Sequence, residues 1–222
     1  ARLYKRQEVT SAAGFAIRPA LSGPLVTDTL YIGLSGVIDS SEGWIGNAYE
    51  GGAIGGRDTK SGLAKIRWTP TNDWDIQLTV SADSYRDIGG FFMLPVDRET
   101  YASQWLPQFY GMAGLTAPPV NLGNFEVFQN VQGRSNSDTN RETLRLAYGA
   151  PGFDVLSIST RRAQTTAFSM DSDLTPLDMQ TYNVDYTLAA YTQEFRVMSR
   201  EGASPFNWLM GAYFEKIDES FL

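Results

Sequence analysis

A strict two-residue alternation of apolar and polar side chains restricts the fold of this chain more than any other feature. In residues 74–83 the apolar side chains are Trp74, Ile76, Leu78, Val80 and Ala82, and every residue between them is polar. A β-strand turns successive side chains to opposite faces, whereas a helix repeats every 3.6 residues. The segment therefore predicts a strand with one apolar and one polar face.

The same alternation recurs along the chain and predicts an all-β fold. The expected strands are about eight in number and cover residues 14–22, 29–35, 64–68, 74–83, 143–148, 153–162, 191–199 and 206–214. No segment of comparable length has a helical period, and residues 98–108 are expected to form at most a short helix inside a loop.

Short and long connections alternate between these strands. The short ones carry Gly, Pro, Asn or Asp and cover residues 23–27, 70–73, 149–152 and 201–205. The long ones cover residues 39–60, 87–140 and 163–189. In an antiparallel up-and-down meander, alternate connections lie at the same end. One end of the sheet should therefore carry tight turns and the other end long loops.

Composition excludes several kinds of chemistry. The 222 residues include no His and no Cys, and the 18 Lys and Arg against 25 Asp and Glu give a net charge of −7. Catalysis by Ser-His-Asp or Cys-His, His-ligated zinc and disulfides are therefore excluded. The acidic balance argues against nucleic acid as a partner. No apolar stretch approaches the roughly 18 residues of a transmembrane helix.

The segregated loops favour a large transmembrane β-barrel. Outer-membrane barrels have short turns on one side, long loops on the other, and strands that are apolar outside and polar inside. The aromatic residues Trp68, Trp74, Tyr148, Phe153, Phe206 and Trp208 all lie close to the short turns, as in the aromatic girdles of such barrels. The alternative is a soluble sheet with aromatic residues near its strand ends.

Two stretches resemble the barrel of TonB-dependent outer-membrane receptors. The first consists of residues 21–36 (LSGPLVTDTLYIGLSG), 43–47 (GWIGN) and 62–74 (GLAKIRWTPTNDW). The second consists of residues 191–199 (YTQEFRVMS) and 206–214 (FNWLMGAYF), and residues 157–162 (SISTRR) add to it. The match spans about 20–86 and 141–217. It implies energy-coupled import of a scarce nutrient, such as a ferric siderophore, cobalamin or a glycan.

The departures from this family imply a fragment. Family members carry a plug domain and a TonB-contacting box ahead of the barrel, and neither is present in residues 1–222. Their barrels have 22 strands, against about eight expected for this chain. We therefore expect residues 1–222 to be the N-terminal portion of a receptor barrel, with long outer loops at about 39–60, 87–140 and 163–189.

Four groups of residues are candidates for a functional site. The glycine-rich segment 51–56 lacks the Gly-Lys-Ser/Thr of a phosphate loop, so we expect a flexible outer loop. Asp171 and Asp173 have a calcium-like spacing but no following Gly or Glu at the required positions. An acid–base pair for glycoside cleavage could come from Asp83, Asp185 and Glu194, although nothing in the sequence brings two of them together.

The fourth group is an aromatic and apolar cluster in the longest loop. It consists of Phe91, Phe92, Met93, Leu94, Tyr101, Trp105 and Tyr110. In a transporter this cluster could contact ligand or fold over the barrel mouth. The more ordinary interpretation is a small core that the loop builds for itself.

Taken together, the sequence predicts no enzyme, no cofactor, no metal site and no identifiable ligand-binding residue. The resemblance implies a Gram-negative outer membrane as the location. The partners it implies are membrane lipid, the remainder of the barrel and its plug, the TonB protein acting through that plug, and a small ligand at the outer loops. Two alternatives stay open: a complete small outer-membrane barrel with an adhesive or structural role, and a soluble β-rich carbohydrate-binding or hydrolytic domain.

Overall fold

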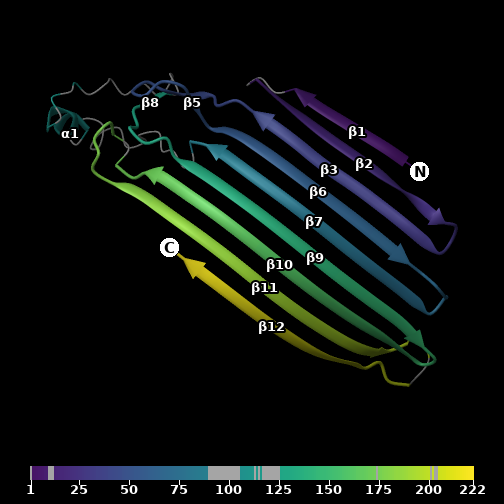
Figure 1. Ribbon diagram of the computed structural model, residues 1–222. Coiled ribbons are helices and arrows are strands. Elements are labelled where there is room, and N and C mark those ends of the chain that lie inside the picture. Colours follow the sequence, from purple (N-terminus) through teal and green to yellow (C-terminus); the bar gives the residue numbers. More distant parts are fainter. Residues whose placement is uncertain are drawn as a thin grey trace.

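The computed structural model shows one large antiparallel sheet (Figure 1). The structure describes residues 2–9, 13–89, 106–112, 114, 116, 126–173, 175–200, 202 and 205–222. The order of strands in the sheet is β1-β2-β3-β6-β7-β9-β10-β11-β12. Their bounds are Arg2–Val9 (β1), Gly14–Val26 (β2), Leu30–Ser41 (β3), Gly56–Trp68 (β6), Trp74–Ile88 (β7), Arg134–Ala150 (β9), Phe153–Asp171 (β10), Thr181–Ser199 (β11) and Leu209–Phe221 (β12).

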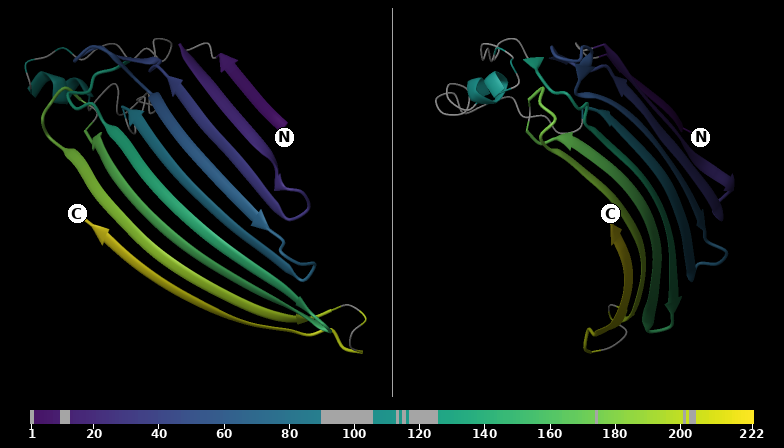
Figure 2. Two further views of the ribbon diagram at one scale, coloured as in Figure 1. Left: turned by 45° about the vertical axis from the view of Figure 1, so that its right-hand side comes forward. Right: turned by 60° about the vertical axis from the view of Figure 1, so that its left-hand side comes forward.

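Every neighbouring pair in this sheet is antiparallel and follows the order of the chain. The predicted all-β meander of eight strands is therefore confirmed, and β1 adds a ninth strand that alternation alone did not indicate. β1 and β12 are the two edges, so the sheet is open in the described part of the chain. The sheet is bent into an arc, as the second view of Figure 2 shows most clearly.

The two ends of the sheet differ as expected. The four connections predicted to be short gather at one end, while the long connections gather at the other end together with the helix α1 (Leu106–Met112) (Figure 1). A second sheet of three short strands also lies at this loop end, in the order β5-β4-β8. These strands are Ile45–Asn47 (β4), Ala53–Ile54 (β5) and Glu126–Val127 (β8).

The third long loop, expected at 163–189, is mostly strand, so that prediction was wrong. β10 and β11 each have 19 residues and pair without interruption from Phe153↔Ser199 to Asp171↔Thr181. Only residues 172–180 connect them. From Ala163 to Ala167 both faces of β10 carry polar or small residues, and only Phe168 and Met170 near its end are large and apolar. Where both faces of a strand are polar, the hydrophobic alternation disappears although the hydrogen-bonded ladder continues.

Most of the other predicted connections are also shorter in the structure, because the strands beside them are longer. The connections expected at 39–60 and 87–140 shrink to residues 42–55, which contain β4 and β5, and 89–133. The turn expected at 23–27 lies at 27–29, because β2 continues through an irregular register between Pro24 and Val26. Asp28 takes a left-handed φ of 59° in that turn. The opposite holds before β12, because Phe206 and Trp208, expected in a strand, precede it.

The sheet has little enclosed core. The buried apolar residues among those described are Ala16, Ile45, Ile54, Tyr110, Val127 and Ala150. Ile45, Ile54 and Val127 form one cluster, which belongs to the small sheet at the loop end. The apolar side chains of the large sheet are therefore not stabilised by a second layer within the described residues.

Candidate functional site

The two faces of the large sheet have opposite character. We call the side that carries Trp74, Ile76, Leu78 and Val80 the apolar face, and the side that carries Asp75 and the residues alternating with it the polar face. Residues directly opposite one another on antiparallel strands share a face. Leu78 thus lies beside Ile66 and Leu144, whereas Gln77 lies beside Arg67 and Arg145.

The apolar face is exposed. Leu78 and Val80 are each 40% exposed, whereas the Asp75 side chain is 26% exposed. Other large apolar side chains exposed on this face are Phe15, Leu21, Leu34, Ile38, Ile66, Trp68, Trp74, Leu144 and Phe195. A continuous surface of this kind is unusual on a water-soluble monomer and marks contact with lipid or with another protein.

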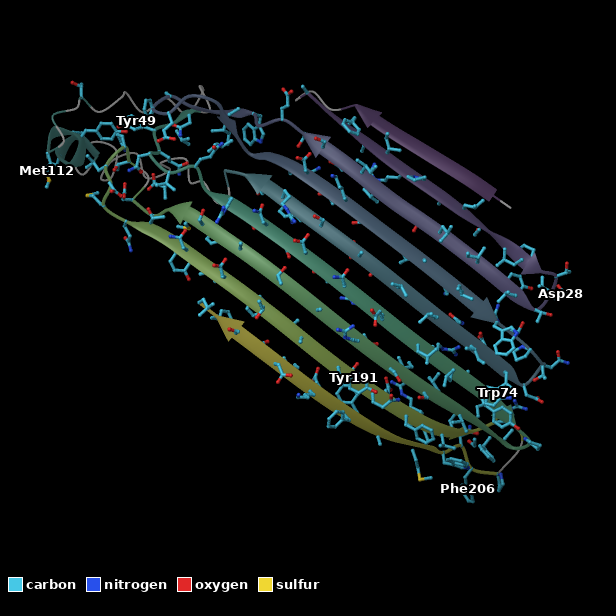
Figure 3. The ribbon with its side chains drawn as sticks, in the orientation of Figure 1. Asp28, Tyr49, Trp74, Met112, Tyr191 and Phe206 are labelled. Carbon is cyan, nitrogen blue, oxygen red and sulfur yellow. The ribbon has the colours of Figure 1, made fainter. Side chains whose placement is uncertain are left out.

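Aromatic side chains mark the tight-turn end. Trp74 and Phe206 both lie there, while Tyr49 and Met112 lie at the loop end (Figure 3). The rings of Trp74 and Tyr148 pack with centroids 4.7 Å apart. Towards the loop end the apolar face carries charged residues. Arg161 Nη1 lies 3.7 Å from Glu142 Oε1, and Arg86 Nη2 lies 2.7 Å from Asp138 Oδ2.

The polar face is held by ion pairs that bridge neighbouring strands. Asp75 on β7 accepts hydrogen bonds from Arg67 Nε at 3.0 Å and from Arg145 Nη1 at 3.2 Å. Gln77 Nε2 also donates to this carboxylate. Three strands are thereby tied together at one carboxylate close to the tight turns.

A second carboxylate ties strands together nearer the loop end. Asp39 Oδ2 on β3 lies 3.2 Å from Arg18 Nη2 of β2, and Asp39 Oδ1 lies 3.5 Å from Arg57 Nε of β6. Tyr85 Oη donates to Asp87 Oδ2 at 3.2 Å on the adjoining strand β7. Such ion pairs are compatible with a surface that faces water, and they hold neighbouring strands of the sheet in register.

Hydroxyl and amide side chains fill the middle of the polar face. Thr143 and Thr160 are hydrogen-bonded across β9 and β10 at 3.2 Å, and Ser137 and Thr166 at 3.1 Å. A groove of 580 Å³ opens on this face over β9 to β12. Arg141, Arg162, Tyr186, Glu215 and Glu219 contribute its charged and phenolic side chains.

The glycine-rich segment belongs to the small sheet at the loop end. Gly51, Gly52 and Gly55 have φ near +80°, which only glycine adopts without strain. Asn47 Nδ2 donates to the carbonyl of Gln129 at 2.8 Å, and both residues are buried. Gly51 and Gly52 thus lie in the turn between β4 and β5, Ala53 and Ile54 form β5, and Gly56 begins β6. The bond from Asn47 holds β4 to residues near β8.

The aspartates with calcium-like spacing form backbone turns. Asp171 Oδ1 accepts the backbone N–H of Asp173 at 3.1 Å. Asp173 in turn accepts the N–H groups of Thr175 and Gln180, each at 2.9 Å. These bonds fold the short connection between β10 and β11. In the part of the chain that the structure describes, no group of three or more potential metal ligands occurs.

The three carboxylates considered for glycoside cleavage do not come together. Asp83 and Glu194 share the polar face but belong to β7 and β11, with β9 and β10 between them. Asp185 lies on the opposite face, opposite Ala167. Glu194 forms an ion pair with Arg196. The geometry therefore offers no acid–base pair from these residues.

The aromatic loop cluster is only partly described. Tyr110 of α1 is 3% exposed. Phe91, Phe92, Met93, Leu94, Tyr101 and Trp105 lie outside the described residues. The short helix expected at 98–108 is placed at Leu106–Met112, so the prediction overlaps α1 by three residues.

The comparisons with known proteins show the class of fold. No family model matches the sequence. The chain is similar to the crystal structure of the ferric yersiniabactin uptake receptor FyuA from Yersinia pestis, with a TM-score of 0.74 and 17% sequence identity. The similarity covers 99% of this chain and 31% of that chain. The fold is therefore similar to that of part of this receptor. Among the described residues, no helix is long and apolar enough to cross a membrane.

Proposed function

We propose that this chain forms the N-terminal part of the barrel wall of a TonB-dependent outer-membrane receptor that imports a scarce nutrient. The observation that carries the proposal is the exposed apolar face, set against a polar face held together by ion pairs, in a single curved sheet. A lipid bilayer on one side and a wet lumen on the other account for both faces.

The height of the apolar surface supports a membrane. On β7 it runs from Trp74 to Ala82, and Arg86 follows on the same face. Eight steps of about 3.3 Å give about 26 Å along the strand. At the usual strand tilt of about 40° this becomes roughly 20 Å across the membrane, close to the apolar band of about 25 Å in such barrels.

Import is supported by the likeness to an uptake receptor and by the arrangement of the loop end. The matched receptor takes up ferric yersiniabactin. A ferric siderophore is accordingly the first substrate class to test, with cobalamin and glycans next. We propose that the outer loops capture this ligand and that the rest of the barrel, a plug and its TonB contact belong to the remainder of the receptor, since this chain spans 31% of the matched one.

The two other functions receive less support. A complete small barrel should bring its first and last strands together, but β1 and β12 are the separated edges of an open sheet. A soluble carbohydrate-binding or hydrolytic domain should cover its apolar face and gather its carboxylates. Here Leu78 and Val80 are exposed, and Asp83, Asp185 and Glu194 are dispersed.

Uptake measurements in a Gram-negative host test the proposal. The full receptor containing this chain should fractionate with the outer membrane, and its intact mass should be several times 24.5 kDa. Cells that express it should accumulate a labelled ferric siderophore, cobalamin or oligosaccharide, and deletion of TonB should abolish that accumulation. Recovery of the protein in the soluble fraction without detergent, or accumulation that persists without TonB, would contradict the proposal.

A further inference from the structure

A pair of arginines faces the groove on the polar face. Arg141 of β9 and Arg162 of β10 are direct register partners, so both side chains project from the same side of adjacent strands. Directly opposed residues have Cβ atoms about 4.5–5.5 Å apart, and like charges placed there destabilise a sheet. Such a pair needs a compensating negative charge.

The described part of the chain supplies no carboxylate for this pair at ion-pair distance. Among the arginines whose side chains the structure describes, the others on the polar face do have carboxylate partners: Arg18 and Arg57 pair with Asp39, Arg67 and Arg145 with Asp75, and Arg196 with Glu194. Of the two groove arginines, Arg162 donates to the neutral amide oxygen of Gln164. Its Nε is buried and has no hydrogen-bond acceptor among the described residues.

The carboxylates that share the groove lie on another strand. Glu215 and Glu219 belong to β12, which is separated from β10 by β11. Two strand spacings of about 4.8 Å place that backbone roughly 10 Å from β10 and about 14 Å from β9. Glu219 already accepts a hydrogen bond from Tyr186 Oη at 3.3 Å. The groove therefore has a cationic wall and an anionic wall.

We propose that Arg141 and Arg162 form a binding site for an oxyanion, a carboxylate or a phosphate, carried by a solute in the lumen. The placement in a lumen rests on the proposed function. Two guanidinium forks can hold one oxyanion through paired N–H donors. The hydroxyls of Thr143 and Thr160 line the same groove; one of them donates to the other, which leaves one O–H as a further donor. The anionic wall favours solutes whose remaining surface bears hydroxyl or amine donors.

Binding of inorganic phosphate and of citrate to the full receptor, purified in detergent, tests this site. We expect either anion to raise the Tm at constant ionic strength, relative to chloride. R141Q and R162Q should weaken the binding by at least about tenfold, the loss expected for a charged hydrogen bond. R161Q is the matched control, because Arg161 directly precedes Arg162 in the sequence, lies on the apolar face and pairs with Glu142. It should bind as the wild type does.

A second readout separates binding from a structural role. In chloride at low ionic strength, R162Q should be as stable as the wild type or more so, because the like-charge repulsion is gone. Failure of both anions to exceed chloride, unchanged binding by R141Q and R162Q, or a lowered Tm of R162Q in chloride would overturn the proposal. These outcomes are independent of TonB-dependent uptake: loss of uptake with anion binding intact would refute the import role alone.

Discussion

Replacement of Leu78 by arginine tests which face of the sheet meets lipid. Leu78 is 40% exposed and lies midway between Trp74 and Ala82 on the apolar face. An arginine at the centre of the bilayer costs about 2–4 kcal/mol in a barrel. Full burial of a leucine contributes about 1.5–3 kcal/mol, so the lipid-covered 40% adds roughly 0.6–1.2 kcal/mol. The free energy of unfolding should fall by about 3–5 kcal/mol.

Leu63→Arg is the matched control for this experiment. Leu63 is 41% exposed but lies on the polar face, opposite Ser35 and Ser81. The same chemical change at the same exposure should cost less than about 1 kcal/mol if that face is wet. The assay is reversible urea unfolding of the full receptor in lipid vesicles, followed by tryptophan fluorescence. Equal losses for the two variants, or a larger loss for L63R, would refute the assignment of the faces.

Three further changes probe the ion pairs and the loop end. Asp75→Asn should lower the free energy of unfolding by about 1–2 kcal/mol, because two partly exposed arginines lose their shared partner. The control Asp83→Asn should lower it by under about 0.5 kcal/mol. Equal effects of the two changes in the urea assay would contradict a stabilising role of the Asp75 ion pairs. Gly43→Ala should expose residues 42–55 to protease, since its Cβ would lie 2.6 Å from the Ile54 carbonyl oxygen, whereas Gly62→Ala has open space and should leave the digestion pattern unchanged. Asn47→Ala should open the same loop, because it removes the 2.8 Å hydrogen bond to the Gln129 carbonyl and lowers the local free energy of unfolding by about 1–3 kcal/mol. Asn47 Oδ1 also accepts the Tyr49 N–H at 3.1 Å, so unaltered hydrogen exchange at that N–H would contradict the prediction.

Alternation located strands only where their two faces meet different surroundings. From Trp74 to Ala82 one face is apolar and the other polar, and the strand was predicted in the right place and with the right faces. From Ala163 to Ala167 neither face is apolar and only Phe168 and Met170 follow, so the second half of the 19-residue strand was mistaken for a loop. The backbone ladder with β11 continues there regardless, because backbone hydrogen bonds do not depend on side-chain polarity.

The candidate site could be anticipated only in part. A polar face was predicted, and the dispersed carboxylates Asp83, Asp185 and Glu194 gave no reason to expect an acid–base pair. The partnership of Asp75 with Arg67 and Arg145 joins residues 8 and 70 positions apart. The opposition of Arg141 and Arg162 depends on the register between β9 and β10. A shift of one residue would turn Arg162 to the other face.

The class of secondary structure, the apolar and polar faces and the gathering of the tight turns at one end could all be predicted, since each follows from local spacing along the chain. The folded chain was needed to establish the strand register, the length of β10 and β11, the small sheet at the loop end and the pairs of charges that face one another. Those features depend on contacts between residues far apart in the chain, and side-chain periodicity carries no information about which strand a residue will meet.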